Sequence, residues 1–326
     1  MIILTCLLIM GMIMPGTIPG FEYGSDGGRL AHIIQKVKPS VVSIHTYGGD
    51  DLDQWCRVGT GFVFRQDGFI VTYHSVIAGG DSIYIKFTDG RRRIALIAGE
   101  DEQSSIVLLK LISEPLTSLS VARAYSLKAG TSLFFMGNSV GVFPSVTLAT
   151  LLNEDRDGLM HLKAMVPPGN CGGPVFTYNG LLAGMIIGRL SEKESAFGEN
   201  DRQGVFLPIK TVERSGNLLI REYRRRQGWL GITAVDIAVE KDSTAVKVIG
   251  LVPGGPAHMA RICRGDTIVG LAGQPVMDVS KLADRIKDFR PDQTVEIQIK
   301  KGGTRISRPV HIGGIPVRKK RPVHGK

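Results

Sequence analysis

A glycine-rich turn at residues 167–174, PPGNCGGP, holds the residue of this chain best suited to nucleophilic chemistry, Cys171. Glycine adopts positive φ angles and lets backbone segments approach closely, so the N–H groups around residues 169 to 171 can converge on one point. Converging N–H donors form an oxyanion hole, which stabilises the charge that develops in acyl transfer. The turn therefore predicts an acyl-transfer site with Cys171 at the nucleophile position and Gly169 and Asn170 in the oxyanion loop.

The same turn resembles the G-N-S-G-G-P signature of trypsin-like serine proteases of the HtrA/Deg family, with cysteine in place of serine. Four further segments match that family in the same order along the chain: VVSI at 41–44, GTGF at 59–62 with DGFIVT at 67–72, LKAG at 127–130, and GNSVG at 137–141. The resemblance covers about residues 28 to 212 and implies a peptidase domain of two β-barrels.

The positions of the other triad members follow from this resemblance. The family's histidine base lies in a T-N-N-H-V-V-A-G run, which reads TYHSVIAG here and places Ser75 at the base position. His74 comes one residue early, and such an offset turns a side chain by about 100° in a helix or to the opposite face of a strand. The family's orienting aspartate matches Ser105, whereas Asp101 matches an aspartate outside the triad.

All three triad positions therefore differ from those of a working serine protease. Loss of one triad member typically lowers the rate by about 10⁴-fold to 10⁶-fold. A thiol can replace the serine hydroxyl, but it needs a histidine or another cationic group to form a thiolate near neutral pH. The resemblance thus implies a pseudoprotease with Ser75, Ser105 and Cys171 at the triad positions. The alternative is a weakly active cysteine endopeptidase that uses Cys171 with a displaced His74.

The C-terminal part of the chain resembles a PDZ domain. Its GWLGI segment at residues 228–232 is similar to the loop that binds a peptide's terminal carboxylate through backbone N–H groups, while the peptide adds as a strand to the sheet edge. The resemblance assigns peptide binding to Trp229, Leu230, Gly231 and Ile232, and a groove helix to residues 280–289. Arg261 departs from the pattern, because the family commonly has glycine there.

Length and composition fit this interpretation. The chain has 326 residues, of which 43% are hydrophobic and 21% charged, so it can bury two separate cores. Its 41 glycines indicate many tight turns between short strands. We expect a mostly β protein, a trypsin-like double β-barrel followed by a PDZ domain. The expected division of the chain is a signal peptide or membrane anchor at 1–20, a peptidase domain at 21–212, a linker helix at 213–228, the PDZ domain at 229–314 and a basic tail at 315–326.

The N-terminus predicts export. Residues 1–14 are almost wholly apolar and are followed by Pro15-Gly16, which is typical of the hydrophobic region of a secretory signal and short for a membrane span of about 20 residues. We expect an exported protein, either periplasmic, extracytoplasmic or membrane-anchored. The four cysteines are far apart and form neither a disulfide framework nor a CxxC metal pair, so we expect free thiols, no metal site and no cofactor.

Charge and family resemblance together indicate the partners. The net charge of +10 permits association with anionic membranes, but no base-stacking aromatic residues accompany the basic clusters, so nucleic acid is not an expected partner. We expect Arg91–Arg93 to lie on a solvated hairpin end and residues 317–321 to form a solvated basic tail. The resemblance implies binding of peptide C-termini or unfolded protein, a role in protein quality control, and a homo- or hetero-oligomer, a trimer, with HtrA-like subunits.

Overall fold

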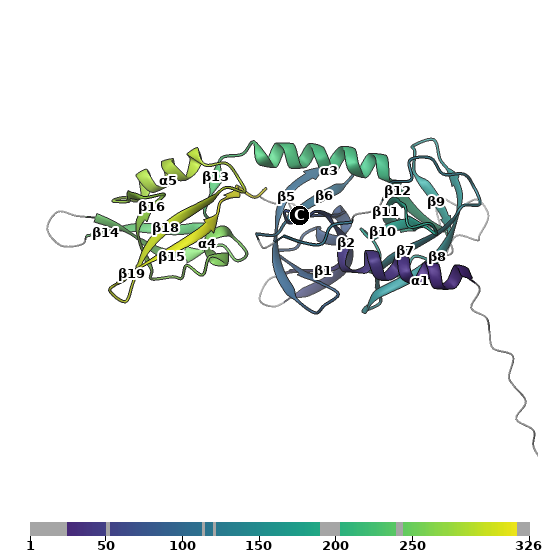
Figure 1. Cartoon of the computed structure of the whole chain (residues 1–326), viewed down its shortest axis with the longest axis horizontal. Coiled ribbons are helices and arrows are strands. Elements are labelled where there is room, and N and C mark those ends of the chain that lie inside the picture. The colour runs from purple at the N-terminus through teal and green to yellow at the C-terminus, as the bar shows by residue number, and fades with distance from the viewer. Residues whose placement is uncertain are drawn as a thin grey trace, which may run out of the picture.

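The computed structural model describes residues 25–49, 53–112, 115–119, 122–189, 203–238 and 244–317. The expected signal segment and nearly all of the expected basic tail lie outside these ranges. Two closed six-stranded barrels and a smaller C-terminal sheet domain follow one another along the molecule (Figure 1), which confirms the expected mostly β fold. Within the described ranges, no helix has both the length and the apolar composition that crossing a membrane requires.

The first barrel is preceded by a helix and a short 3-10 turn, α1 (Ser25–Val37) and η1 (Lys38–Ser40). Its strands hydrogen-bond in the order β1-β2-β3-β6-β5-β4. They are β1 (Val41–Gly48), β2 (Trp55–Arg65), β3 (Phe69–Tyr73), β4 (Ser82–Lys86), β5 (Arg92–Asp101) and β6 (Ile106–Lys110), with the one-turn helix α2 (His74–Ile77) after β3. Gly68 makes the turn between β2 and β3 at φ 92°, where a Cβ would lie 2.4 Å from the Leu111 carbonyl oxygen.

The second barrel repeats the antiparallel plan with the order β10-β11-β12-β9-β8-β7. Its strands are β7 (Ser132–Ser139), β8 (Val142–Glu154), β9 (Met160–Lys163), β10 (Pro174–Thr177), β11 (Leu182–Arg189) and β12 (Gln203–Pro208). The glycine-rich turn at 167–174 leads directly into β10. Phe134 and Phe176 stack in its core with ring centroids 5.2 Å apart.

One hydrophobic core joins the two barrels and the helix that follows them. It contains Phe62 and Phe69 from the first barrel, Phe134 from the second, and Val212 and Leu219 from α3 (Ile209–Arg224). This helix begins four residues before the expected linker helix at 213–228 and lies across both barrels, against β5, β6, β11 and β12 (Figure 1). Its buried face packs on strands of both barrels.

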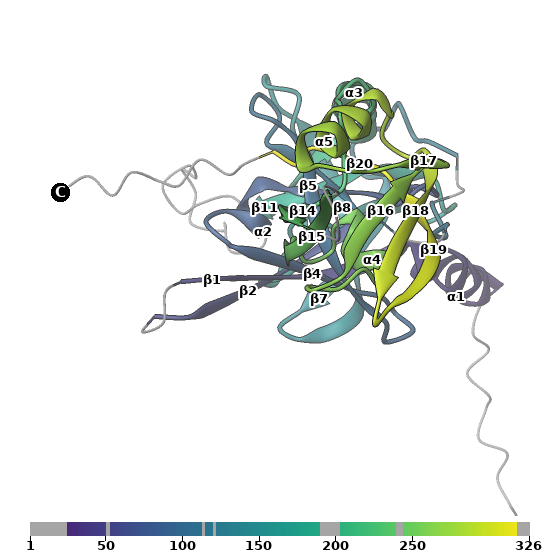
Figure 2. The same cartoon turned by 90° about the vertical axis from the view of Figure 1, so that its left-hand side faces the viewer.

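The C-terminal domain is an antiparallel sheet with the order β14-β15-β16-β18-β19, and Figure 2 views the molecule from this end. The sheet strands are β14 (Ile232–Ala238), β15 (Thr244–Leu251), β16 (Thr267–Leu271), β18 (Thr294–Lys301) and β19 (Thr304–His311). Short pairings are made by β13 (Gly228–Trp229), β17 (Gln274–Pro275) and β20 (Gly313–Gly314), and two helices complete the domain, α4 (Pro256–Met259) and α5 (Val279–Asp288). The groove helix expected at 280–289 is α5, one residue earlier, and Asp278 caps it by accepting a hydrogen bond from the Lys281 N–H.

Polar contacts join the C-terminal domain and the segment after it to the first barrel and to α3. The Lys110 ammonium, at the end of β6, lies 2.7 Å from Oδ1 of Asp292. The Gly314 N–H donates to the Tyr223 hydroxyl of α3 at 2.9 Å, and the Val317 N–H donates to the Ile97 carbonyl of β5 at 3.1 Å. The C-terminal domain and the segment that follows it thus contact the first barrel and α3 at three separate points.

Candidate active site and peptide-binding loop

The turn at 167–174 has the backbone shape that its glycines predicted. Gly169 lies at φ 94° and Gly172 at φ 84°, in the left-handed region that favours glycine. A Cβ at Gly169 would lie 2.2 Å from the Asn138 carbonyl oxygen, and one at Gly172 would lie 2.1 Å from the Thr60 carbonyl oxygen. Both positions therefore require glycine for close backbone approach as well as for conformation.

Two of the N–H groups in this turn make no hydrogen bond to another residue. Among the residues that the structure describes, the N–H groups of Gly169 and Cys171 have no acceptor in another residue, whereas the Asn170 N–H donates to the Pro167 carbonyl at 3.3 Å. The Asn170 side-chain amide donates to the Ser139 hydroxyl at 3.1 Å and to Pro167 at 3.0 Å. Asn170 thus supports the loop, and the N–H groups of Gly169 and Cys171 are the two donors of this turn that have no partner in another residue.

Thr60 of β2 holds the turn in place, a role that the sequence did not reveal. Its hydroxyl donates to the Gly169 carbonyl at 2.6 Å, and its N–H donates to the Cys171 carbonyl at 2.9 Å. The Thr72 hydroxyl donates to the Thr60 carbonyl at 2.7 Å. Because Thr60 and Gly169 are 109 positions apart in the chain, local sequence patterns carry no signal for this contact.

Cys171 is half-buried at the junction of the barrels. Its thiol donates to the Ile187 carbonyl, with the sulfur 3.5 Å from that oxygen. Burial raises the pKa of the Cys171 thiol, and this effect outweighs hydrogen bonds from the Ser75 side chain and from the backbone, which lower the pKa. Ser75, which the resemblance places at the base position, thus contacts the Cys171 thiol, but its hydrogen bond does not offset the effect of burial on the pKa of that thiol.

His74 has a different neighbour. Its Nδ1 is hydrogen-bonded to the Glu100 carboxylate on β5, and its backbone N–H donates to the Ser105 carbonyl at 2.8 Å. Within the described part of the chain, no hydrogen bond joins His74 to Cys171. Ser105, at the orienter position, adopts the left-handed conformation at φ 55°. The sequence singled out His74 but not Glu100, whose role depends on the pairing of β5 with β6.

The surroundings leave space for a substrate or ligand next to the loop. A hollow of about 560 Å³ is lined by residues 55–58 of β2, by Asn138, Val140 and Gly141, and by Pro168 and Gly169 of the turn. The site thus combines a thiol, two free N–H donors and an adjoining hollow. What it lacks, among the described residues, is an imidazole in contact with the thiol.

The loop at the start of the C-terminal domain lies at the sheet edge, because β14 is the first strand in the sheet order. Gly231 lies at φ 76°, and the N–H groups of Leu230 and Gly231 have no acceptor among the described residues. The Leu230 side chain belongs to the domain core. A Cβ added to Gly231 would lie 3.0 Å from the ring of Trp229. Leu230 and Trp229 therefore shape the loop, and Ile232 begins the edge strand.

The described residues offer no metal site: they contain no group of three or more His, Cys, Asp or Glu side chains placed to hold an ion. Cys56 and Cys263 are exposed free thiols, and Cys171 is also unpaired. Cys6 lies outside the described residues.

Two family models match the chain, a trypsin-like peptidase domain at residues 59–185 and a PDZ domain at 228–312. The chain is 28% identical over 273 residues to a protein of Chlamydia trachomatis named "Probable periplasmic serine endoprotease DegP-like", covering 79% of this chain and 54% of that protein. It is 27% identical over 279 residues to a Rhizobium meliloti protein of the same name, covering 81% and 55%. The chain thus spans about half the length of these curated relatives.

Solved structures share the fold. The HtrA-type protease AlgW with a decapeptide superposes with a TM-score of 0.52 at 22% identity, over 89% of this chain and 99% of that one. A serine endoprotease from Yersinia pestis gives a TM-score of 0.51 at 22% identity, over 88% and 98%. These similarities extend over both barrels and the C-terminal domain together.

Proposed function

This chain belongs to the HtrA/Deg family, and we propose that it is a pseudoprotease that binds peptides or misfolded chains through its PDZ domain. The observation that carries the proposal is the environment of Cys171, whose thiol contacts Ser75 and the Ile187 carbonyl and has a raised pKa. A neutral thiol is a poor nucleophile, because the thiolate is the species that attacks a carbonyl. The free N–H donors of Gly169 and Cys171 remain suited to binding a carbonyl oxygen without cleaving its bond.

The PDZ domain is the proposed binding module. A peptide that adds to β14 would place its terminal carboxylate at the loop, where the Leu230 and Gly231 N–H groups have no acceptor among the described residues. The helix α5 contacts β14 and would flank the added strand. We expect a preference for an apolar C-terminal residue, because Ile232 and the side chains of the domain core line the start of the strand.

The proposal extends to the setting of the protein. Its curated relatives are named periplasmic serine endoproteases, which supports an exported, periplasmic location. We propose a role in protein quality control, in which this chain regulates an active HtrA-like partner within a mixed oligomer, a trimer. The basic charge would allow association with an anionic membrane surface.

The decisive experiment is a cleavage assay with casein and with peptide substrates. We expect no turnover by the wild-type chain above background, and no change on Cys171→Ala. A variant with the family's triad, Ser75→His with Ser105→Asp and Cys171→Ser, tests whether the oxyanion loop is competent, and its activity would show that the assay can detect cleavage. Wild-type turnover that Cys171→Ala abolishes would overturn the pseudoprotease proposal.

Peptide capture is tested by titrating the full chain with one peptide as the free acid and as the C-terminal amide. We expect tighter binding of the free acid and loss of that difference in Gly231→Ala, because a Cβ at φ 76° strains the loop. Gly265→Ala is the matched control, since Gly265 lies at φ 96° in the same domain with no atom within 4 Å of the added Cβ. Equal affinity of the wild type for acid and amide would rule out carboxylate capture.

The alternative function is a weakly active cysteine endopeptidase, and one observation favours it. The hydrogen bond between His74 and Glu100 resembles the base and orienter pair of a triad. If binding of a substrate brought this imidazole to Cys171, the thiol could be activated. Turnover that both His74→Ala and Cys171→Ala abolish would establish this function.

A further inference from the structure

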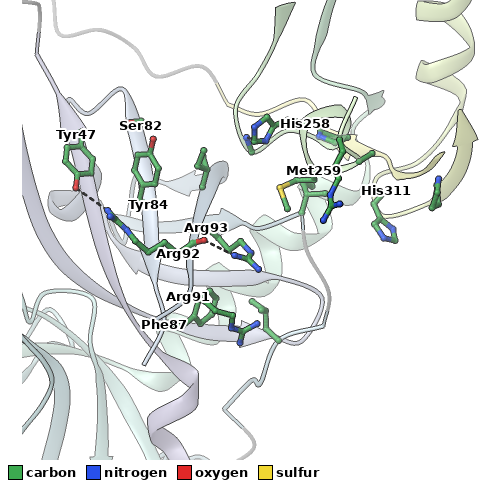
Figure 3. A pocket seen from close by; sticks show the side chains of 18 residues that line it. Tyr47, Ser82, Tyr84, Phe87, Arg91, Arg92, Arg93, His258, Met259 and His311 are labelled. Carbon is green, nitrogen blue, oxygen red and sulfur yellow. Dashed lines mark hydrogen bonds between the residues drawn. The ribbon is translucent and has the colours of Figure 1, made fainter. Parts of the chain in front are cut away.

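A cleft of about 1080 Å³ lies between the first barrel and the C-terminal domain, away from both the Cys171 loop and the β14 edge. Its walls come from β4 and β5 of the barrel on one side and from α4 and β19 on the other (Figure 3). In Figure 3, Arg92 and Arg93 extend from the barrel, and His258, Met259 and His311 lie opposite. The cleft is therefore shared between two domains.

The lining of this cleft is strongly basic. Its titratable groups, apart from tyrosines, are Arg91, Arg92, Arg93, His258, Arg261 and His311, and no Asp or Glu lines it. Asp89 pairs with Arg91 at 2.7 Å, but no carboxylate of the described residues lies within ion-pair distance of Arg92, Arg93 or Arg261. As expected, Arg91–Arg93 lies exposed at the end of the β4–β5 hairpin, and there it also forms one wall of the interdomain cleft.

Two of the arginines are held in place by aromatic rings. The Arg91 guanidinium lies 5.2 Å from the centroid of the Phe87 ring, and the Arg92 guanidinium lies 5.7 Å from that of Tyr84. Arg93 is held by a hydrogen bond from its guanidinium to the Arg92 carbonyl at 2.9 Å. Stacked guanidinium groups lose less freedom on binding a ligand, and their planar set of donors matches the oxygens of a phosphate group.

Arg261 supplies a second, independent observation. It adopts φ 59°, a left-handed conformation that glycine takes freely and that strains a residue with a bulky side chain. The resemblance described above places glycine at this position. Arginine at this position adds a positive charge to the second wall of the cleft in a backbone conformation that suits glycine.

We propose that this cleft binds a ligand with two or more phosphate groups, which bridges the first barrel and the C-terminal domain. Its volume is large for a single phosphate ion, and it presents guanidinium groups from both walls. An acidic peptide strand fits less well, because Pro309 lacks an N–H donor in the edge strand β19, which forms part of the wall. The ligand chemistry is shared by soluble polyphosphates and by lipid headgroups with two phosphates.

Two measurements test the proposal. The first is a calorimetric titration of the full chain with inorganic tripolyphosphate at low salt. The second is sedimentation of the full chain with phosphatidylcholine vesicles that contain or lack cardiolipin. We expect Arg92→Ala with Arg93→Ala to weaken binding about 100-fold and Arg261→Gly about 10-fold, because each removes a charge-assisted hydrogen bond to phosphate. Arg261→Gly should not lower the thermal unfolding midpoint, since glycine suits φ 59°. This separates loss of binding from loss of folding.

Arg156→Ala and Arg305→Ala are the matched controls, because both remove one positive charge from an exposed side chain outside the cleft. They should change affinity less than about twofold. Binding of tripolyphosphate that only the cleft variants lose supports a soluble ligand, and cardiolipin-dependent sedimentation with the same losses supports a lipid headgroup. The proposal is overturned if neither probe binds, if the controls lose as much affinity as the cleft variants, or if a glutamate oligopeptide binds more tightly than both probes.

Discussion

Lys110 is a buried cation that joins the first barrel to the C-terminal domain through an ion pair with Asp292. Neutralising the Asp292 carboxylate should lower the free energy of unfolding of the protein. Its side chain is 4% exposed, and its ammonium contacts Oδ1 of Asp292 at 2.7 Å and the Asp67 carbonyl. It also lies 4.4 Å from the centroid of the Phe69 ring. The perturbation is Asp292→Asn, which keeps the size of the side chain and tolerates the φ of 70° at this position.

The expected loss follows from what remains around the ammonium. Removing one partner of a buried ion pair costs about 3 to 5 kcal/mol, because the other charge is left without compensation. Here the Asp67 carbonyl and the Phe69 ring stay in place, and an asparagine oxygen can still accept a hydrogen bond. Asp292 is also 31% exposed, so water replaces part of the lost interaction. We therefore expect Asp292→Asn to lower the free energy of unfolding by about 2 kcal/mol.

The assay is equilibrium unfolding in urea, with Asp288→Asn as the control. Asp288 is exposed on α5, has no ion-pair partner among the described residues, and gives the same change in net charge. Lys110→Met in the Asp292→Asn background should recover at least half of the loss, because methionine fills the same space without a charge that needs a partner. If Asp292→Asn shifts the midpoint no more than Asp288→Asn, or if Lys110→Met adds to the loss, the reasoning about the buried ammonium is refuted.

Three further outcomes are expected. Because burial raises the pKa of the Cys171 thiol, iodoacetamide should alkylate it more slowly than exposed Cys56 from about pH 6 to pH 9, and an inflection below about pH 6 in the alkylation profile would contradict this. Burial raises the pKa of the Asp101 carboxyl, but hydrogen bonds from Ser215 and other donors lower it more, so the pKa in the folded protein lies below its usual value. Ionised Asp101 therefore stabilises the folded protein above about pH 4, and this stabilisation is lost as the pH falls through the folded-state pKa. Asp101→Asn should reduce the acid dependence of the urea midpoint in that range, and an unchanged profile would count against the role of these bonds. Gly172→Ala should lower the free energy of unfolding by at least about 2 kcal/mol, because a Cβ would lie 2.1 Å from a carbonyl oxygen at φ 84°; an unaltered midpoint in thermal unfolding would contradict this.

The family resemblance was sufficient to predict the architecture. Its motifs, in order along the chain, implied two barrels followed by a PDZ domain, and the many glycines indicated tight turns between short strands. Gly169 and Gly172 lie in the turn for which the sequence predicted an unusual backbone shape, and each has a positive φ. Such positions are predictable because the left-handed region excludes most other residues whatever the rest of the chain does.

The role of the linker helix was not predictable from its own residues. Its amphipathic pattern indicated a helix, and the chain forms α3, but the pattern does not say which surface covers the apolar face. In the folded chain Val212 and Leu219 enter the core shared by both barrels. The identity of that partner surface depends on strands far away in the sequence.

For this protein, the sequence by itself determined the residue types at the Cys171 loop and the backbone shapes that glycine permits there. Tertiary structure decided how these groups meet: Thr60 anchors Gly169, Glu100 holds His74, and Arg261 lines a cleft opposite the Arg91–Arg93 segment. The physical reason is range. Backbone conformation is set by each residue and its neighbours, whereas hydrogen bonds, burial and the electrostatic surroundings of a thiol or a guanidinium are set by groups that only folding brings within a few ångströms.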